Sequence, residues 1–191
     1  MEDCLVLVDR GFFKLVKKEF EIKTRMKFGF LDTFKKICKS ENLGLKHLFI
    51  YDAPPFQSKI PTLEEKKLKK KYDSIKKRFD KKRWITLREG RCQKIFNEKR
   101  QLVFNQKGVD AWIVADLCLF KEDFPNISKI ILISSDSDFA PIIKMIQEKK
   151  NIEVMLYTYF ENNRKSKFNC SNHLIKSCAK YRKLKLGDFA K

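Results

Sequence analysis

The sequence predicts an α/β fold in which a mostly parallel sheet carries helices on both faces. Short apolar runs rich in Val, Ile and Leu recur along the chain, as is typical of strands that are buried on both sides. Longer segments between them repeat apolar residues every three or four positions, which is the spacing of amphipathic helices. Strands that alternate with helices form βαβ units with right-handed crossovers. Since no repeat, linker or low-complexity segment interrupts the pattern, we expect a single domain over residues 1–191.

The first part of the chain predicts two strands separated by helical sequence. The run CLVLVD (4–9) is short, apolar and rich in branched residues, so it predicts a central strand. Residues 12–39 have helical periodicity, and Gly29 is the expected boundary between two helices. HLFIYDAPP (47–55) predicts a second strand, which two successive prolines end because proline cannot continue a central ladder.

The middle of the chain predicts a very basic helix followed by a strand. Residues 61–83 begin with Pro and Thr, and acidic residues occupy the first helical turn, which is a helix start signal. WITLREGR (84–91) alternates apolar and polar residues, as a half-buried strand does. Residues 92–106 are ambiguous, and we expect either a loop or a hairpin there.

The last part of the chain continues the alternation. AWIVADLCLF (111–120) predicts a strongly apolar helix, and KIILIS (129–134) predicts another buried strand. Residues 139–150 predict a helix with a proline in its first turn, where the missing N–H does no harm. IEVMLYTY (152–159) is the expected last strand, and HLIKSCAKYRKL (173–184) is the expected final helix.

The composition favours a basic protein that binds a polyanion. The 43 Lys and Arg residues exceed the 24 Asp and Glu residues, giving a net charge of +19, and nucleic acid is the expected partner. The alternative explanation of the charge is a lysine-rich composition bias, in which the lysines lie on solvated helix faces and bind no partner. No apolar run approaches the ~20 residues of a membrane helix, and acidic residues follow Met1 where a signal peptide is positive. We therefore expect a cytoplasmic protein with no membrane partner.

The six cysteines predict neither a zinc site nor a disulfide framework. None of them forms a CxxC pair, and the chain has only two histidines. We expect free thiols in a reducing compartment.

Several aspartates fall where a parallel sheet binds its ligands. Asp9 ends the first strand, and Asp136 and Asp138 follow the 129–134 strand, so all three are expected at the carboxyl edge. Asp110 starts the 111–120 helix at the same edge, whereas Asp116 lies six residues further on and on another helix face. Carboxylates gathered in this way repel one another unless a divalent cation such as Mg²⁺ or Mn²⁺ lies among them.

Each aspartate also has a structural alternative. Asp110 can serve as the N-cap of its helix, with Gly108 making the turn. Asp136 or Asp138 can cap the helix that follows, and we expect one of them to do so while also serving the site. Asp9 is harder to explain structurally, because burying an unpaired carboxylate is costly.

The order of these blocks resembles the NYN domains, the LabA-like branch of the PIN-like nuclease superfamily. SDSDF alone would be a weak match, but KGVD upstream and VD near the start make the resemblance specific. The matching blocks are LVLVDRGFF (5–13), YDAPP (51–55), EEKKLKKKYDSIKKRF (64–79), LREGR (87–91), QKGVDAWIVADL (106–117), SSDSDFAPIIKMIQEKK (134–150) and SNHLIKSCAKY (171–181).

The resemblance implies a PIN-like three-layer α/β/α fold and metal-dependent cleavage of RNA phosphodiester bonds. It implies that Mg²⁺ or Mn²⁺ is held by Asp9, Asp110, Asp136 and Asp138, with Asp116 as a further catalytic candidate. Arg10 follows Asp9 where the family often has Gly. We expect this guanidinium to pair with Asp9, to bind a phosphate or to compete with the metal.

An RNA substrate needs cations, because phosphate contacts supply most non-specific affinity. The predicted nucleic-acid-binding residues are Arg10, Lys77, Arg78, Lys81, Lys82, Arg83, Arg88, Arg91 and Lys107. Trp84, Tyr72 and Phe79 are candidates for stacking on bases, although aromatic residues at helical spacing more often belong to a core.

Two functional hypotheses follow, and a third fits less well. The first is an endoribonuclease that acts on single-stranded or structured RNA. The second is an RNA-binding module on the same fold with weak or lost catalysis, which needs only the basic surface. A carboxylate-based phosphatase for small phosphate esters fits the acids but not the charge of +19. The sequence leaves the natural substrate and the oligomeric state open.

Overall fold

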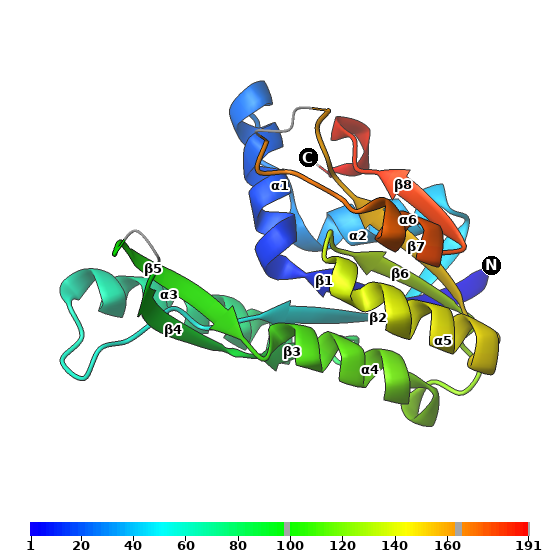
Figure 1. Cartoon of the computed structure of the whole chain (residues 1–191), viewed down its shortest axis with the longest axis horizontal. Coiled ribbons are helices and arrows are strands. Elements are labelled where there is room, and N and C mark those ends of the chain that lie inside the picture. The colour runs from blue at the N-terminus through cyan, green and yellow to red at the C-terminus, as the bar shows by residue number, and fades with distance from the viewer. Residues whose placement is uncertain (98–99, 163–165, 191) are drawn as a thin grey trace.

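The computed structural model describes residues 1–97, 100–162 and 166–190, and its centre is a six-stranded parallel sheet. The strand order is β3-β2-β1-β6-β7-β8 (Figure 1), which confirms the predicted parallel sheet. The strands are β1 (Glu2–Asp9), β2 (Leu43–Asp52), β3 (Ile85–Glu89), β6 (Lys129–Ile133), β7 (Glu153–Thr158) and β8 (Lys180–Lys183).

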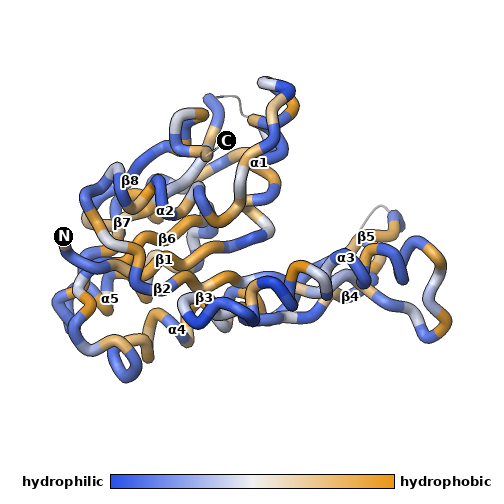
Figure 2. The backbone as a smooth tube through the Cα atoms, turned by 180° about the vertical axis from the view of Figure 1, so that it is seen from behind, coloured by the Kyte–Doolittle hydropathy of each residue, from blue (hydrophilic) through white to orange (hydrophobic). Residues whose placement is uncertain are grey.

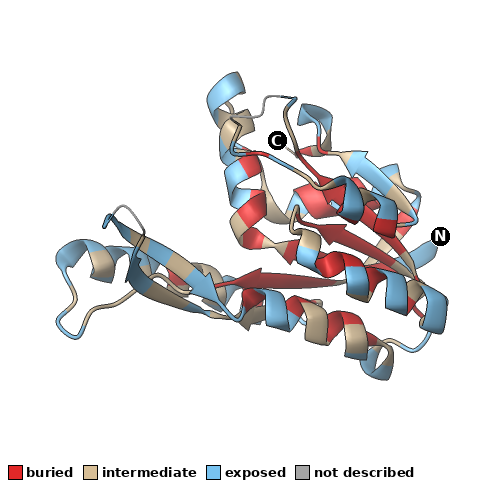
Figure 3. Cartoon of the chain, in the orientation of Figure 1, coloured by how far each residue is buried: buried red, intermediate tan, exposed pale blue. Residues whose placement is uncertain are grey.

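Helices cover both faces of the sheet, so the fold has three layers. On one face, α1 (Arg10–Thr24), α2 (Phe30–Ser40) and the end of α3 (Leu63–Asp80) pack in one apolar cluster. On the other face, α4 (Val109–Asp123), α5 (Ala140–Lys150) and α6 (Asn172–Ser177) share a second cluster. Two short 3-10 helices, η1 (Ser137–Phe139) and η2 (Leu186–Asp188), complete the set. Figure 3 shows the buried residues concentrated in the central strands and on the helix faces that cover them.

Strand β1 lies between β2 and β6 and contributes to both apolar clusters. Val6 and Val8 face α1 and α2, whereas Leu5 and Leu7 face α4 and α5. This alternation is the two-residue period of a strand that is buried on both faces. By the same period, Asp9 follows Leu7 on the side of α4 and α5.

Local signals explain where several helices begin. Gly29 is the N-cap of α2, so the predicted boundary between two helices is confirmed. Thr62 caps α3 and forms a reciprocal capping box with Glu65. Gly108 precedes α4 with a φ of 79°, a left-handed conformation that glycine adopts at little cost.

The end of the chain corrects one prediction. The helix predicted over 173–184 ends at Ser177, and Lys180–Lys183 forms β8 beside β7, so β7 is not the last strand. The backbone N–H of Ala179 donates to Val154 and that of Leu184 donates to Thr158. Pairing with the otherwise open edge of β7 therefore outweighs the local helical periodicity.

The ambiguous segment 92–106 is a hairpin, apart from residues 98–99, which lie outside the described residues. Strands β4 (Arg91–Phe96) and β5 (Leu102–Lys107) pair antiparallel and form a separate two-stranded sheet. This hairpin, α3 and the connection 53–62 project together from the sheet, and we call them the arm (Figure 1). Figure 2 shows that α3 is mostly hydrophilic, unlike the central strands.

The cysteines and the helices were also the subject of predictions from composition. All six cysteines are free thiols. Among the helices in the described ranges, none is long and apolar enough to cross a membrane.

Candidate active site

Asp9 lies where β1 passes into α1, and its carboxylate accepts hydrogen bonds from α1 and from the residue that follows β6. It is the N-cap of α1, and Oδ1 accepts a hydrogen bond from the backbone N–H of Phe12 at 3.0 Å. The hydroxyl of Ser134, beyond the end of β6, lies 3.5 Å from Oδ2. Burial, and then the charges of Asp110 and Asp136, raise the pKa of Asp9 to about 6. Asp9 is therefore a fixed carboxylate beside two other negative charges.

Asp110 is an exposed residue in the first turn of α4. The N-cap of this helix is Gly108, so the alternative in which Asp110 is the N-cap is wrong. Partial desolvation, followed by the charges of Asp136 and Asp138, raises the pKa of Asp110. Asp110 thus experiences the same group of carboxylates as Asp9, from a different element.

Asp136 and Asp138 lie in the turn that joins β6 to α5. Asp136 caps η1 by accepting a hydrogen bond from the backbone N–H of Asp138 at 2.9 Å, and its own N–H donates to the Ser134 hydroxyl at 3.2 Å. Asp136 therefore caps η1, whereas α5 begins after Phe139 without a side-chain cap, so the prediction that Asp136 or Asp138 caps the 139–150 helix is wrong. Asp138 keeps an exposed side chain.

These four aspartates come from three elements and form an acidic group without a partner cation. In the described part of the chain, no Lys or Arg forms an ion pair with Asp9, Asp110, Asp136 or Asp138. Their oxygen ligands and mutual repulsion suit a hard divalent cation. In the described ranges, however, no three acidic, His or Cys side chains lie close enough to hold an ion in their present rotamers. Binding would need Asp110 or Asp138, whose side chains are exposed, to rotate.

Asp116 does not join this group. It is buried and accepts two hydrogen bonds from Arg88, at 2.9 and 3.1 Å, and one from the Tyr51 hydroxyl at 2.9 Å. The guanidinium of Arg88 also lies 5.2 Å from the ring centre of Trp112. These contacts correct two predictions, because they assign Asp116 and Arg88 to a structural ion pair between α4 and β3.

Arg10 is also placed differently from the prediction. Its side chain is buried on the face opposite Asp9, where it pairs with the buried carboxylate of Asp52. The guanidinium lies 5.7 Å from the ring centre of Phe30 and 6.0 Å from that of Phe79. Arg10 therefore stabilises the core here, and it neither pairs with Asp9 nor presents a surface contact for phosphate.

Two residues near the aspartates were not predicted. Lys14 pairs with Asp52 at 2.9 Å, keeps a half-exposed side chain, and lies close enough to Asp9 for that charge to act on it. Desolvation is the main effect that lowers the pKa of Lys14. A Cβ at Gly11 would lie 3.2 Å from Asp9 Oδ1 and 3.4 Å from Gln106 Oε1, so Gln106 brings the hairpin to the site. Lys14 lies five residues after Asp9, in the second turn of α1, and this position was a usable signal, whereas no sequence signal indicated Gln106.

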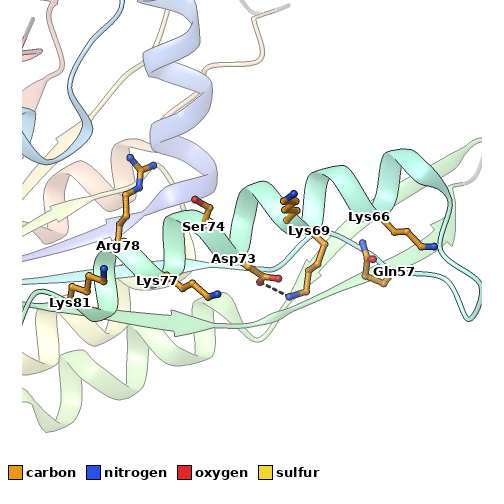
Figure 4. A pocket seen from close by; sticks show the side chains of 9 residues that line it. Gln57, Lys66, Lys69, Asp73, Ser74, Lys77, Arg78 and Lys81 are labelled. Atoms are coloured by element: carbon orange, nitrogen blue, oxygen red, sulfur yellow. Dashed lines mark hydrogen bonds and ion pairs between the residues drawn. The ribbon is translucent and has the colours of Figure 1, made fainter.

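The predicted basic residues of α3 lie along the arm, and Arg78 also lines a second pocket together with Lys14. A groove of about 660 Å³ runs along this helix, with Asp73 paired to Lys69 within it (Figure 4). Its cationic residues are Lys66, Lys69, Lys70, Lys77, Arg78 and Lys81. Lys82 and Arg83 follow the helix and are exposed, as are Arg91 and Lys107 at the base of the hairpin.

The three aromatic residues suggested for stacking belong mainly to the core. Tyr72 and Phe79 are buried. Trp84 is half-buried against the apolar cluster that α1, α2 and the end of α3 form with the sheet. The ammonium of Lys35 lies 5.6 Å from the centre of its ring. The alternative that assigned them to the core is confirmed for Tyr72 and Phe79.

Comparisons with known proteins agree with this fold. The model of the NYN domain matches residues 50–185, which include Asp110, Asp136 and Asp138 but not Asp9. A crystal structure of a protein of unknown function from Vibrio parahaemolyticus superposes with a TM-score of 0.54 at 16% identity, over 98% of this chain and 96% of that one. No curated protein matches the chain significantly. Because the domain model covers well over half of its length, the chain belongs to the NYN domain family, within the PIN-like nuclease superfamily.

Proposed function

We propose that this protein is a metal-dependent endoribonuclease whose site consists of Asp9, Asp110, Asp136 and Asp138. The observation that carries the proposal is the gathering of four carboxylates from three elements, without a partner cation in the described part of the chain. A protein gains nothing in stability from such mutual repulsion, so the arrangement is best explained by a positively charged ligand.

The aspartates are proposed to hold Mg²⁺ or Mn²⁺ in different ways. Asp9 is the preorganised member, because the Phe12 N–H and the Ser134 hydroxyl orient it. Asp110 and Asp138 are exposed and complete the set by rotating. The chemistry that a bound divalent cation supplies is activation of a water molecule and neutralisation of charge on the phosphate.

The remaining residues of the site act on the substrate. Lys14, half-exposed beside Asp9, offers its ammonium to a phosphate of the RNA. Hydrolysis forms a bond from phosphorus to the water oxygen and breaks a bond from phosphorus to a ribose oxygen, which leaves with a proton. The cationic residues of α3 lie away from the aspartates and supply affinity for the polyanion. The net charge of +19 on the whole chain adds to this attraction.

The alternative is an RNA-binding module with weak or lost catalysis. One observation favours it: in the described ranges, no three candidate ligands lie within reach of one ion. The two functions differ in whether the carboxylates must act together.

Cleavage of a labelled single-stranded RNA with Mn²⁺ or Mg²⁺ tests the proposal. We expect cutting that EDTA stops, that Asp136→Asn abolishes and that Asp80→Asn retains. Asp80 is the matched control, because it is an exposed aspartate at the end of α3 that also loses one negative charge. RNA binding that survives in Asp136→Asn, without cleavage by the wild type, would establish the binding module. Activity on a small chromogenic phosphate ester but not on RNA would indicate a phosphatase.

A further inference from the structure

The exposed face of the β4–β5 hairpin carries aromatic side chains that the fold does not bury. In the antiparallel register, Gln106 lies opposite Cys92, Phe104 opposite Lys94, and Leu102 opposite Phe96. Residues directly opposite in such a pair share a face. Phe96 is 72% exposed and Phe104 is 59% exposed, and Lys94 and Gln106 are exposed as well. Large aromatic side chains in water, side by side on one face, indicate a binding surface.

One end of this hairpin face lies near Asp9. Gln106 Oε1 and Asp9 Oδ1 lie 3.4 and 3.2 Å, respectively, from a Cβ placed on Gly11. From Gln106 the face extends along β5 to Leu102, a distance of roughly 13 Å at about 3.3 Å per residue. It leads outward along the arm (Figure 1). A ligand on this face can therefore reach the site without leaving the protein surface.

A basic and aromatic cluster lies halfway along this face. The ring of Phe56, from the connection before α3, lies 5.8 Å from the ring of Phe104. The ammonium of Lys94 lies 5.8 Å from the ring centre of Phe56. An aromatic face beside a lysine is the combination that binds a base together with its phosphate.

The charge of the hairpin favours RNA over a protein partner. Residues 91–107 contain five Lys or Arg residues and one Glu, which is a net charge of +4. Protein interfaces are depleted in lysine, and a second copy of this chain would bring the same positive charge to the contact. A polyanion with flat apolar groups fits both properties of the face.

We propose that the exposed face of the β4–β5 hairpin guides single-stranded RNA to the aspartates, with bases stacked on Phe96 and Phe104 and a phosphate at Lys94. The inference rests on the proposed function, because it names the substrate class and its path to that site. Bases must be unpaired to present their faces to a side chain, so a perfect duplex is excluded from this path.

Binding measurements in EDTA separate this inference from catalysis. The probes are a labelled oligouridine and a blunt RNA duplex, and the protein carries Asp136→Asn so that no probe is cut. Phe104→Leu keeps apolar volume but removes the aromatic ring, and we expect about a 5- to 100-fold loss of affinity for oligouridine. Duplex affinity is expected to stay within about twofold. Phe104→Tyr keeps an aromatic face and is expected to bind oligouridine like the parent.

A matched control addresses general surface effects. Tyr181, on the edge strand β8, is 47% exposed, so Tyr181→Leu removes a comparable ring elsewhere and is expected to change neither affinity. Thermal unfolding of each variant shows whether the hairpin change has disturbed the fold, and Phe104→Tyr keeps the ring that contacts Phe56.

Three outcomes would overturn the inference. Unchanged oligouridine affinity in Phe104→Leu and Phe96→Leu is the first, and an equal loss for oligouridine and duplex is the second. The third is a dimer of the wild type that the two variants dissociate without losing RNA affinity, which would make the face an interface between copies. If oligouridine binding depends on Phe104 but the wild type cuts no RNA, the proposed nuclease function is wrong. The hairpin face would still be a binding surface for single-stranded RNA.

Discussion

Asp9 and Arg10 are consecutive residues, yet their side chains act on opposite faces of the sheet. Asp9 faces the acidic group with Asp110 and Asp136, whereas Arg10 is buried against Asp52, Phe30 and Phe79. Asp9 is the extended N-cap of α1 and Arg10 is its first helical residue, so the backbone changes conformation between the two side chains. An arginine beside the aspartates in the sequence is therefore compatible with a free acidic site.

The buried pair of Arg10 and Asp52 is expected to contribute to stability and not to chemistry. Among the described residues, Arg10 Nε and Asp52 Oδ1 have no hydrogen-bond partner, so the pair is only partly satisfied. Asp52→Ala leaves the Arg10 charge buried with no carboxylate, and we expect a loss of about 3–5 kcal/mol in the free energy of unfolding by urea denaturation.

The surface pair of Lys46 and Asp3, with both side chains about half exposed, provides the control for that loss. Asp3→Ala is expected to change stability by less than about 1 kcal/mol. A small effect of Asp52→Ala, similar to that of Asp3→Ala, would contradict a structural role for the Arg10 pair.

The burial of Asp9, together with the charges of Asp110 and Asp136, predicts a pH-dependent gain in stability for Asp9→Asn. The pKa of Asp9 in the folded protein, about 6, lies above the unfolded value, so folding favours the protonated form. Wild-type stability is thus lost as pH rises from about 4 through 6. Asparagine keeps the capping oxygen without the charge, and without metal we expect a gain of up to about 3 kcal/mol at pH 7.5.

That gain is expected to fall below about 1 kcal/mol at pH 4, where Asp9 is protonated in the folded state and about half protonated in the unfolded state. Urea unfolding of wild type and variant in EDTA at the two pH values measures the difference, with Asp80→Asn as an exposed control. A gain of equal size at both pH values would show that the charge of Asp9 is not its cause.

Much of the fold could be predicted because its determinants are local. Val6 and Val8 alternate with Leu5 and Leu7 in a run that can only be buried on both faces, and Gly29 and Thr62 begin helices through their own backbone and side-chain preferences. The segment Lys180–Lys183 could not be predicted, because its conformation depends on the open edge of β7.

The positions of the candidate site residues differ in how far the sequence predicts them. Asp9, Asp110, Asp136 and Asp138 follow from the rule that parallel strands and crossover helices meet at one edge of the sheet. The partners of the charged residues do not follow from any such rule. Asp116 is neutralised by Arg88, 28 positions away, and Arg10 by Asp52, 42 positions away, so both depend on tertiary packing.

Asp116 and Asp136 are expected to respond in opposite ways to the same substitution. Asp116→Asn removes the charge that pairs with Arg88 in a buried position, and we expect a loss of about 2–4 kcal/mol in stability with cleavage retained below the unfolding temperature. Asp136→Asn is expected to abolish cleavage with little loss of stability. Thermal unfolding and single-turnover cleavage at 20 °C measure both quantities.

Metal binding separates the two residues further. Millimolar Mn²⁺ is expected to raise the Tm of the wild type and of Asp116→Asn but not that of Asp136→Asn. If Asp116→Asn lost both cleavage and the Mn²⁺ effect while remaining folded, Asp116 would be a ligand after all, and the side chain would have to leave Arg88 on binding.

The basic groove of α3 is expected to supply affinity without selectivity. Lys77 and Lys81 line one side of it and form no ion pair with the described residues. Lys77→Gln with Lys81→Gln should weaken oligouridine and duplex binding by similar factors and reduce the slope of log K against log salt by up to about 1 for each lost phosphate contact.

Lys39→Gln with Lys149→Gln removes the same charge from exposed sites on α2 and α5. If that control lowers the slope equally, only the net charge of +19 matters and the groove has no special role, whereas a selective effect of the α3 pair would place the RNA backbone along the arm.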